Sequence, residues 1–557
     1  MRTLWTLGCI AGLAGVGALT ACSDHPYDPA TPVLDPNAPR VHITSPARGT
    51  FAGEMATLVV RGTASDDVRV AAVEVNGVAA ALAGDGTWSA TIPVATGTQL
   101  IHAVATDADG NTSKESRAVV VGPLQPIAAA VPQAITAVIS AQTFAALGTG
   151  VAGYLKAGQL AQAIAASNPV LDVNGGPDCL YVQGSLTSAA VGAATTVALV
   201  PVPGGLALDV ELDRVAVGMH LEYAAACLDG KRDITVAASH IQITGTLRAG
   251  ITAGAFDVAL VDQHVKVTGL DVDLGGLPGE VEDLLHFDAV LGPILGLAAE
   301  KLVVPVVNRA LAQLNDVNTV DVLGTSIGID VAPARISFDA SGAIIELDAS
   351  LRAHGDDRSP GYVYVANQLP AMSTERGFAL AVADDAANQL VGSFWAAGGL
   401  DRTFDLTTGS YGNLGQLYDR VELSAQVPPF VDASGGALSL TIGDLIATFR
   451  NGDAVATQVA INASVAVKVV AGTDGLPRLD VGAPTTYVDV LDEGVAGSNA
   501  LSNAQFEAIT SFALGRVIAV GSGLVGAVPL PTFGGVTMRD VGVAAQTGYL
   551  VVAGDVE

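Results

Sequence analysis

The sequence predicts an α+β chain in which an N-terminal all-β sandwich precedes long helices laid on a highly curved antiparallel sheet. Short alternating runs separated by turn residues fill residues 41–122, and longer alternating runs cover residues 206–274. An apolar stripe at helical spacing then extends from Val281 to Leu311. Period-two alternation is typical of strands with one buried face, and a spacing of three and four is typical of an amphipathic helix.

The composition excludes several classes of function. The 557 residues are 50% hydrophobic and only 15% charged, so disorder is excluded as the general state, and the length suggests three or four domains. Lys and Arg number 26 against 55 Asp and Glu, a formal net charge of −29. Nucleic-acid binding needs Lys and Arg to neutralise phosphates, so we expect no nucleic-acid partner. An apolar, acidic chain favours apolar ligands.

Residues 1–21 have the features of a lipoprotein signal peptide. Arg2 precedes an apolar stretch over residues 4–16, which is short for a membrane span. Residues 19–22, Leu-Thr-Ala-Cys, resemble a bacterial lipobox, which implies cleavage before Cys22 and acylation of its thiol. Ser23 rather than Asp follows, the pattern of outer-membrane delivery, so we expect a lipid-anchored protein of the cell envelope. An ordinary signal peptide with an incidental Cys is the alternative.

The remaining cysteines predict one disulfide. Cys9 lies in the signal peptide and Cys22 carries the lipid, which leaves Cys179 and Cys227. An oxidising envelope favours a bridge between them. A metal or redox pair is the alternative, but the C-x-x-C spacing and nearby His ligands are missing.

A Pro-rich linker over residues 22–40 precedes the sandwich, and its composition favours an extended spacer. Within residues 41–122, the phrases at 62–67 and 105–111 look like those of bacterial Ig-like repeats. We therefore expect an Ig-like domain that acts as a spacer. Four carboxylates in these phrases are candidate Ca²⁺ ligands, although turn formation by Asp is the favoured interpretation. They are Asp66, Asp67, Asp107 and Asp109.

The alternation over residues 206–274 changes parity four times. Apolar residues at even positions from Leu206 to Leu212 give way to odd positions from Val215 to Tyr223, and similar changes follow in the next two runs. A parity change requires an inserted residue, a bulge or a turn. Repeated bulges bend a long sheet around its contents, which is the interpretation we favour. Short strands joined by a turn at each change explain the pattern equally well.

Two helical stretches complete the first half. One covers residues 142–166, and the other covers 281–311 with an expected kink at Gly292-Pro293. Their apolar stripes predict helices lying on the curved sheet.

The run from Ala198 to Leu311 resembles the amino-terminal half of the bactericidal/permeability-increasing and lipopolysaccharide-binding family, which is grouped with the cholesteryl ester transfer proteins. Val200-Pro201 before Gly205-Leu206 fits the start of that family's long hairpin strands, and residues 325–353 are similar to its strands leading into a central sheet. The tubular lipid-binding (TULIP) domains of this family hold lipid between long helices and a curved sheet. The resemblance implies one TULIP-like barrel over residues 124–355 and a second over 356–557.

The carboxyl half adds to this resemblance and also departs from it. Residues 372–400 resemble the strand and helix that open the second barrel, and residues 528–552 resemble the family's final linker and strand. Cys179 and Cys227 do not match the family's usual disulfide. Residues 124–353 contain ten Lys and Arg against 23 Asp and Glu, which disfavours recognition of lipid phosphates by a basic patch.

The predicted site is an apolar lining for acyl chains in each barrel. Because the same residue types also form dry cores, packing alone is the alternative for each of them. In the first barrel the predicted lining is Phe144, Leu147, Val151, Leu155, Leu284, Leu291, Ile294 and Leu297. In the second barrel it is Leu390, Phe394, Trp395, Phe506, Ile509 and Phe512.

Two motifs suggest catalysis or cofactor binding but lack the required context. Residues 148–153 match G-x-G-x-x-G, but residues 138–147 look helical rather than extended, whereas a dinucleotide site needs a strand there. Residues 324–328 match G-x-S-x-G around Ser326, but a strand-like run follows where a nucleophile elbow needs a helix. We expect neither a cofactor nor an enzyme.

The sequence therefore predicts a non-enzymatic, membrane-anchored lipoprotein that binds phospholipid or lipid A-like acyl chains, and it leaves open whether the protein also transfers them. A surface adhesin or envelope scaffold with an Ig-like stalk is the first alternative. An esterase or lipase that uses Ser326 is the second, and it requires a His and an acid within hydrogen-bonding distance of the hydroxyl.

Overall fold

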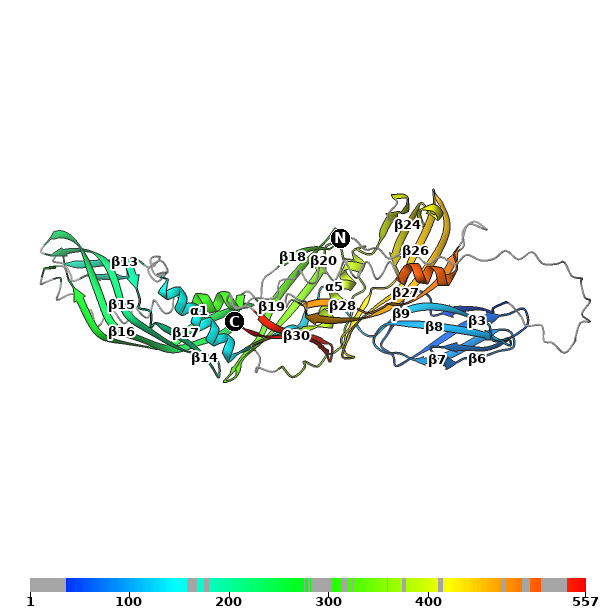
Figure 1. Ribbon diagram of the computed structural model, residues 1–557, viewed down its shortest axis with the longest axis horizontal. Helices are drawn as coiled ribbons and strands as arrows, with labels where there is room; N and C mark the ends of the chain where they lie inside the picture. The colour runs from blue at the N-terminus through cyan, green and yellow to red at the C-terminus, as the bar shows by residue number, and fades with distance from the viewer. Residues whose placement is uncertain are drawn as a thin grey trace, which may run out of the picture.

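A computed structural model shows an elongated molecule (Figure 1). A strongly curved sheet forms one end, a central sheet the middle, and a second curved sheet with the sandwich beside it the other end. The strongly curved antiparallel sheet that the sequence predicts is confirmed as a half-barrel, and the described part of the chain is mostly β rather than α+β. The structure describes residues 37–157, 168–174, 180–225, 227–274, 276–278, 281, 303–312, 314, 318–322, 324–357, 359–372, 377–408, 414–471, 477–492, 501–511 and 538–556.

The sandwich consists of two sheets that pack around one apolar cluster. Trp88, Ile43 and Ile101 are among its buried residues, so Trp88 is part of the core. One sheet is ordered β1 (Arg40–Ser45), β3 (Thr57–Ser65), β7 (Thr87–Pro93) and β6 (Ala81–Leu82). The other is ordered β2 (Thr50–Gly53), β9 (Thr112–Val121), β8 (Gly97–Asp107), β4 (Val70–Val75) and β5 (Val78–Ala79).

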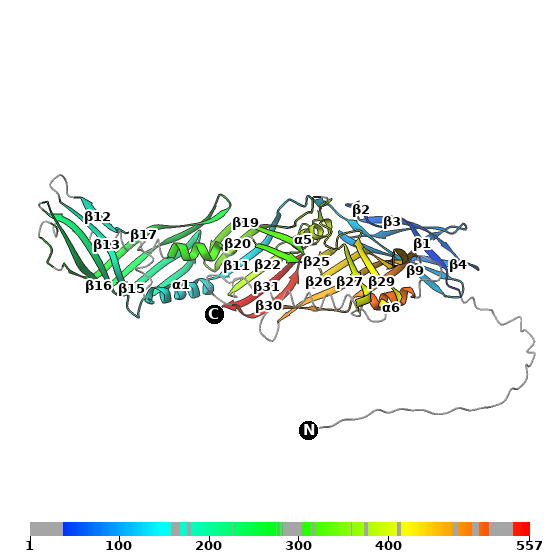
Figure 2. The ribbon, with the colours of Figure 1, turned by 90° about the horizontal axis from the view of Figure 1, so that it is seen from above.

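The first barrel is built on long continuous strands (Figure 2). Its antiparallel sheet is ordered β12 (Leu171–Asn174), β13 (Tyr181–Ala190), β15 (Gly205–Ala225), β16 (Leu228–Thr252) and β17 (Ala255–Asp273), and β14 (Thr196–Val202) also pairs with β15.

Bulges explain the parity changes in these strands. Arg214, Ser239 and Gly269 on three neighbouring strands are all skipped in the register, and Arg214 and Gly269 have positive φ. A further shift in β17 contains Asp262, also at positive φ. The bulge interpretation is therefore confirmed, since each strand continues through its parity change. Bulges at the same level on adjacent strands increase the twist and bend the sheet.

Helix α1 (Ala141–Lys156) begins where the sequence predicts, with Ser140 as its N-cap. The prediction of helix before it was wrong, because residues 138–140 belong to strand β11 (Val131–Ser140). Gly148 nevertheless lies inside α1 rather than in a strand-to-helix turn, so the glycine motif is not a phosphate loop. A Cβ on Gly148 would lie 2.5 Å from the Val197 carbonyl oxygen, so this glycine permits close packing of α1 on β14.

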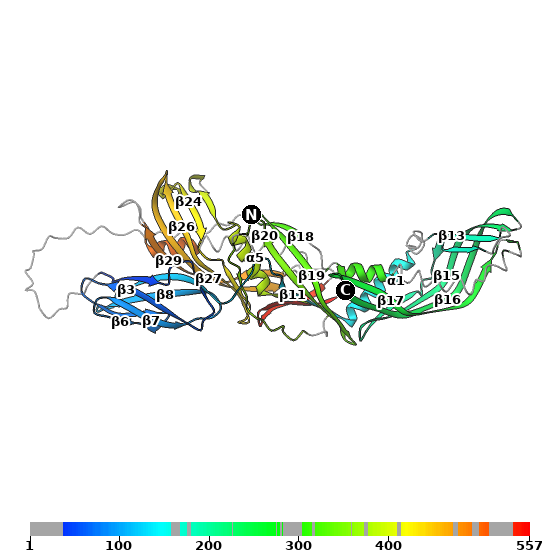
Figure 3. The same ribbon diagram turned by 180° about the vertical axis from the view of Figure 1, so that it is seen from behind.

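A seven-stranded central sheet joins the two barrels (Figure 3). It combines strands from both sides of residue 355, where the sequence places a domain boundary. Its order is β18 (Asn318–Val322), β19 (Thr325–Asp339), β20 (Gly342–Ala353), β11, β22 (Phe378–Ala383), β31 (Tyr549–Val556) and β30 (Met538–Gln546). The short strands β10 (Leu124–Gln125) and β21 (Tyr362–Val363) pair separately.

The second barrel has the sheet order β23 (Arg402–Asp405), β24 (Arg420–Ala425), β26 (Leu438–Asn451), β27 (Ala454–Ala471) and β28 (Pro477–Val481), with β25 (Phe430–Asp432) and β29 (Thr485–Asp492) attached. Helix α5 (Asp384–Ala396), the short helix α6 (Leu414–Leu417) and a helix over 503–511 accompany it.

Two remaining predictions concern the membrane and the disulfide. No helix in the described part of the chain has the length and apolar character needed to cross a bilayer. Cys227 is disulfide-bonded. Its predicted partner Cys179 lies outside the described residues, as do the signal peptide and Cys22, so those assignments stay predictions.

Candidate functional site: the apolar wall of the first barrel

The concave face of the first barrel is lined by apolar side chains. On β15, Leu208, Val210 and Leu221 are at most 3% exposed, and Ile234 and Ile243 on β16 are similarly buried. The bulges keep these side chains on one face, because each parity change in the sequence coincides with a skipped residue in the register. The result is a continuous apolar wall.

At strand β17, one of the two edge strands of this sheet, the wall is only partly covered. We use the name β17 stripe for its half-buried inward residues, which pack against the main apolar cluster of the barrel without being enclosed by it. Protein packing covers these apolar side chains only in part, so each of them keeps some apolar surface exposed. The β17 stripe consists of Phe256, Leu260, Val265, Val267, Leu270 and Val272.

The outer face of the same strands is polar. His220 on β15 contacts Asp233 at 2.6 Å, and His240 on β16 pairs with Glu211. Asp257, Lys266 and Asp271 are exposed on the outer face of β17. The sheet therefore has a polar, solvent-facing outer side and an inner side of apolar side chains. This is the pattern expected of a wall around an apolar interior.

The predicted helical lining of the first barrel is buried where the structure describes it. Phe144, Leu147, Val151 and Leu155 of α1 are at most 4% exposed and belong to the same apolar cluster as the wall. The helix over 303–312 adds buried residues such as Val303 and Val307, four positions apart. The other predicted lining residues, Leu284, Leu291, Ile294 and Leu297, lie outside the described residues.

In the second barrel the predicted residues lie in three different environments. Leu390 and Phe394 of α5 pack on Ile327 and Ala353 of the central sheet. Phe506 is buried against Phe449, with ring centroids 5.4 Å apart, in the barrel's own cluster. Trp395 faces the sandwich, with its ring 6.2 Å from that of Phe51, and its indole N–H donates to the Ala425 carbonyl oxygen. Ile509 is half-buried, and Phe512 lies outside the described residues.

Helix α5 presents a buried polar face, which the sequence analysis did not anticipate. Gln389 is fully buried: its amide donates to the Ile127 and Ala129 carbonyl oxygens and accepts from the Leu351 N–H. Asn388 donates to the Val431 carbonyl oxygen and accepts from the Val431 N–H. Such satisfied amides fix α5 between the central sheet and the second barrel rather than lining an apolar hollow.

Two adjacent carboxylates begin this helix. Burial raises the pKa of Asp384 to about 6, although N–H donors of Ala433 and Asn367 partly offset the effect. Burial likewise raises the pKa of Asp385 to about 7, against the lowering effect of the Val365 N–H and with a further rise from Asp384. Hydrogen bonds hold both carboxylates in place. Because their pKa values are higher in the folded chain than in the unfolded chain, the stability of the protein depends on pH.

Ser326 does not form the contacts that an esterase requires. It lines a pocket of about 450 Å³ together with His354 and Asp356. Asp356 instead binds Arg352 and accepts a hydrogen bond from the Ser393 hydroxyl. Among the described residues, neither a His ring nor a carboxylate hydrogen-bonds the Ser326 hydroxyl, so the catalytic set is not assembled there.

The Ca²⁺ candidates form turn interactions. The Asp66 carboxylate accepts from the N–H groups of Val68 and Arg69, and Asp107 accepts from Asp109 and Asn111. Asp67 accepts from the Asn37 side chain. Within the described ranges, no group of three or more His, Cys, Asp or Glu is placed to hold a metal ion. Turn formation is the interpretation that these contacts favour.

The predicted lining names no individual strand residue, and the structure adds those of the β17 stripe. Their alternation was visible in the sequence, but a strand pattern does not show which strand is the edge of its sheet. The pairing order is what identifies β17 as an edge strand. The lining prediction therefore concentrated on helix residues, which the structure buries most completely.

Comparisons with known proteins cover the two parts of the chain differently. Residues 39–122 match the family model described as glucodextranase, domain B. A comparison of the sequence with the curated proteins finds no match.

Two solved structures match most of the chain at low identity. Lipopolysaccharide binding protein is 15% identical, with 77% of this chain and 99% of that chain covered at a TM-score of 0.39. P47 of Clostridium botulinum E1 is 7% identical, with 77% of this chain and 100% of that chain covered at a TM-score of 0.25. At these scores, the assignment of the fold rests on the strands and sheets described above.

Proposed function

We propose that this protein is a non-enzymatic lipid-binding protein with TULIP-like barrels, and that the first barrel holds acyl chains against the β17 stripe. The observation that carries the proposal is this half-covered apolar stripe on a sheet whose opposite face is polar. Burial of an acyl chain against this stripe would be favourable by about 0.8 kcal/mol for each CH₂ removed from water. The excess of acidic over basic residues disfavours recognition of lipid phosphates by a basic patch, so hydrocarbon is the part of the lipid that is recognised.

The curvature of the sheet supports the proposal. Three aligned bulges bend β15, β16 and β17 together, so that their apolar faces surround a common interior. Ligand sites of this kind are concave and mostly apolar. The experiment is native mass spectrometry of the purified chain, in which bound lipid is expected and a persistently lipid-free protein overturns the proposal.

We further propose that Cys22 anchors the protein in the cell envelope, at the outer membrane. This part rests on the lipobox and on Ser23 in the sequence. The Cys22→Ala variant is expected to move from the membrane fraction to the soluble fraction and to lose label from an acyl-chain precursor. A variant that stays in the membrane fraction with unchanged labelling contradicts the anchor.

A further inference from the structure

The sandwich packs along the second barrel rather than standing apart from it (Figures 1 and 3). Ala118 and Val120 of β9 form an apolar cluster with Val427 and Phe430 of the barrel. The Thr98 hydroxyl donates to the Pro428 carbonyl oxygen across the same boundary. The two parts therefore share a dry contact, which a flexible spacer would not have.

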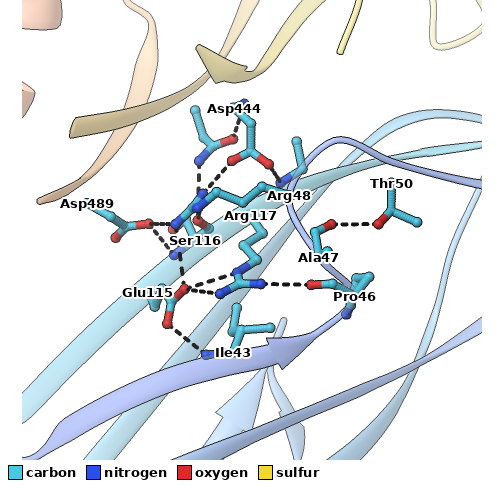
Figure 4. A network of polar contacts seen from close by, with 12 residues as sticks. Ile43, Pro46, Ala47, Arg48, Thr50, Glu115, Ser116, Arg117, Asp444 and Asp489 are labelled. Carbon is cyan, nitrogen blue, oxygen red and sulfur yellow. Dashed lines mark hydrogen bonds and ion pairs between the residues drawn. The ribbon is translucent and has the colours of Figure 1, made fainter. Parts of the chain in front are cut away.

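Barrel carboxylates bind the sandwich strand β9 at residues that precede its short pairing with β2 at 119–121 (Figure 4). The Ser116 N–H donates to Asp489 at 2.7 Å, and the Ala118 N–H donates to Asp444 at 3.1 Å. Unpaired N–H groups at a sheet edge normally need a further strand or water. Here two side chains of the second barrel take that place.

Arg48 of the sandwich lies between these carboxylates (Figure 4). Its guanidinium contacts Asp444 at 2.5 Å, Asp489 at 3.3 Å and Glu115 at 3.5 Å, and it donates to the Ser116 carbonyl oxygen. Asp444 is fully buried and Asp489 is 5% exposed. Burial raises the pKa of Asp489 to about 6, and Arg48 opposes this rise. Without Arg48, Asp444 and Asp489 would be buried carboxylates with no ion-pair partner among the described residues.

The barrel strand β26 is shaped for this contact. Asp444 has a φ of 42° and lies in a register shift between Ile442 and Leu445, which directs its carboxylate toward the sandwich. Its neighbour Gly443 has no room for a side chain, because a Cβ there would lie 2.3 Å from the Ala118 Cβ. A non-Gly residue at positive φ costs of order 1–3 kcal/mol and persists where the surrounding structure requires it.

We propose that the Ig-like sandwich is docked permanently on the second barrel, with Arg48 as the clamp, so that the two form one folding unit. The sandwich is then a structural part of the barrel, in contrast to the spacer that the sequence suggests. The proposal does not depend on lipid binding, since none of its contacts involves the first barrel.

Hydrogen exchange of the full chain tests this clamp at strand β9. In the Arg48→Met variant, protection of residues 112–121 is expected to fall at least about 100-fold, the scale of breaking a buried ion pair. Protection of β3 in the sandwich core should fall less than that of β9, because β3 amides exchange only when the sandwich itself unfolds. Arg69→Met is the matched control, because Arg69 is exposed in the same domain, and it should behave as wild type.

A second variant separates undocking from unfolding of the sandwich. Gly443→Ala removes no hydrogen-bonding side chain. It adds a methyl group that would collide with the Ala118 side chain across the contact. It should lower protection of residues 112–121 as Arg48→Met does, whereas Gly435→Ala, with open space around it, should not. If β9 in both Arg48→Met and Gly443→Ala exchanges like the controls, or if the wild-type sandwich unfolds in a separate transition from the barrel, the clamp is refuted.

Discussion

A Val267→Asp substitution is expected to reduce uptake of a fluorescent phospholipid from vesicles at least about 100-fold. Val267 is half-buried in the β17 stripe, with its side chain on the apolar side of the sheet. A carboxylate there would have to lose water when hydrocarbon approached it, at a cost of several kcal/mol. Because Val267 is not enclosed in the free protein, the carboxylate keeps part of its hydration and the fold should survive.

The matched control for this variant is Thr268→Asp. It adds the same charge one residue further on, and Thr268 is exposed on the opposite face of β17. Equal circular dichroism spectra and closely similar unfolding midpoints would establish that both variants are folded. Loss of uptake in both variants, or in neither, would show that the β17 stripe is not the contact surface for lipid.

The Asp385→Asn substitution is expected to raise the free energy of unfolding at pH 8 by roughly 2 kcal/mol. Burial raises the pKa of Asp385 to about 7 from its ordinary value of 3.8, so the folded chain binds this proton more tightly than the unfolded chain. The favourable contribution of the protonated group is complete below about pH 4 and is lost as pH rises to about 7. An Asn side chain has no charge to desolvate and keeps an oxygen for the Val365 N–H.

Urea unfolding at pH 5 and pH 8 measures this effect. The wild-type chain should lose more stability between the two pH values than the Asp385→Asn variant. Asp401→Asn, at an exposed carboxylate of the same region, should leave the pH dependence unchanged. A variant that is less stable than wild type at pH 8 would mean that the ionised carboxylate contributes favourably through its hydrogen bonds.

The sequence predicts the local features of this fold well, because alternation directly reports which face of a strand is buried. The parity changes around Arg214, Ser239 and Gly269 predicted the bulges that bend the first barrel. The apolar spacing from Phe144 to Leu155 predicted a helix that is buried along one side. In both cases neighbouring residues carry the whole signal.

Features that join distant segments could not be predicted in this way. Arg48 and Asp444 are 396 positions apart, and nothing in either neighbourhood indicates the other. In the sequence, the polar residues of α5 are typical of the solvent-exposed first turns of a helix. In the fold, Gln389 and Asn388 instead contact the central sheet and β25. Residues 138–140 were misassigned because their apolar run continues into α1, and a short apolar run does not distinguish strand from helix.

Native mass spectrometry of the intact purified chain tests lipid binding most directly. The account predicts a folded species heavier than the 55.9 kDa sequence mass, corrected for any processing, by the mass of one or more lipids. Denaturation should release this extra mass, and the Val267→Asp variant should show less of it than Thr268→Asp. A folded chain that carries no releasable lipid, and acquires none after incubation with phospholipid vesicles, would contradict the account.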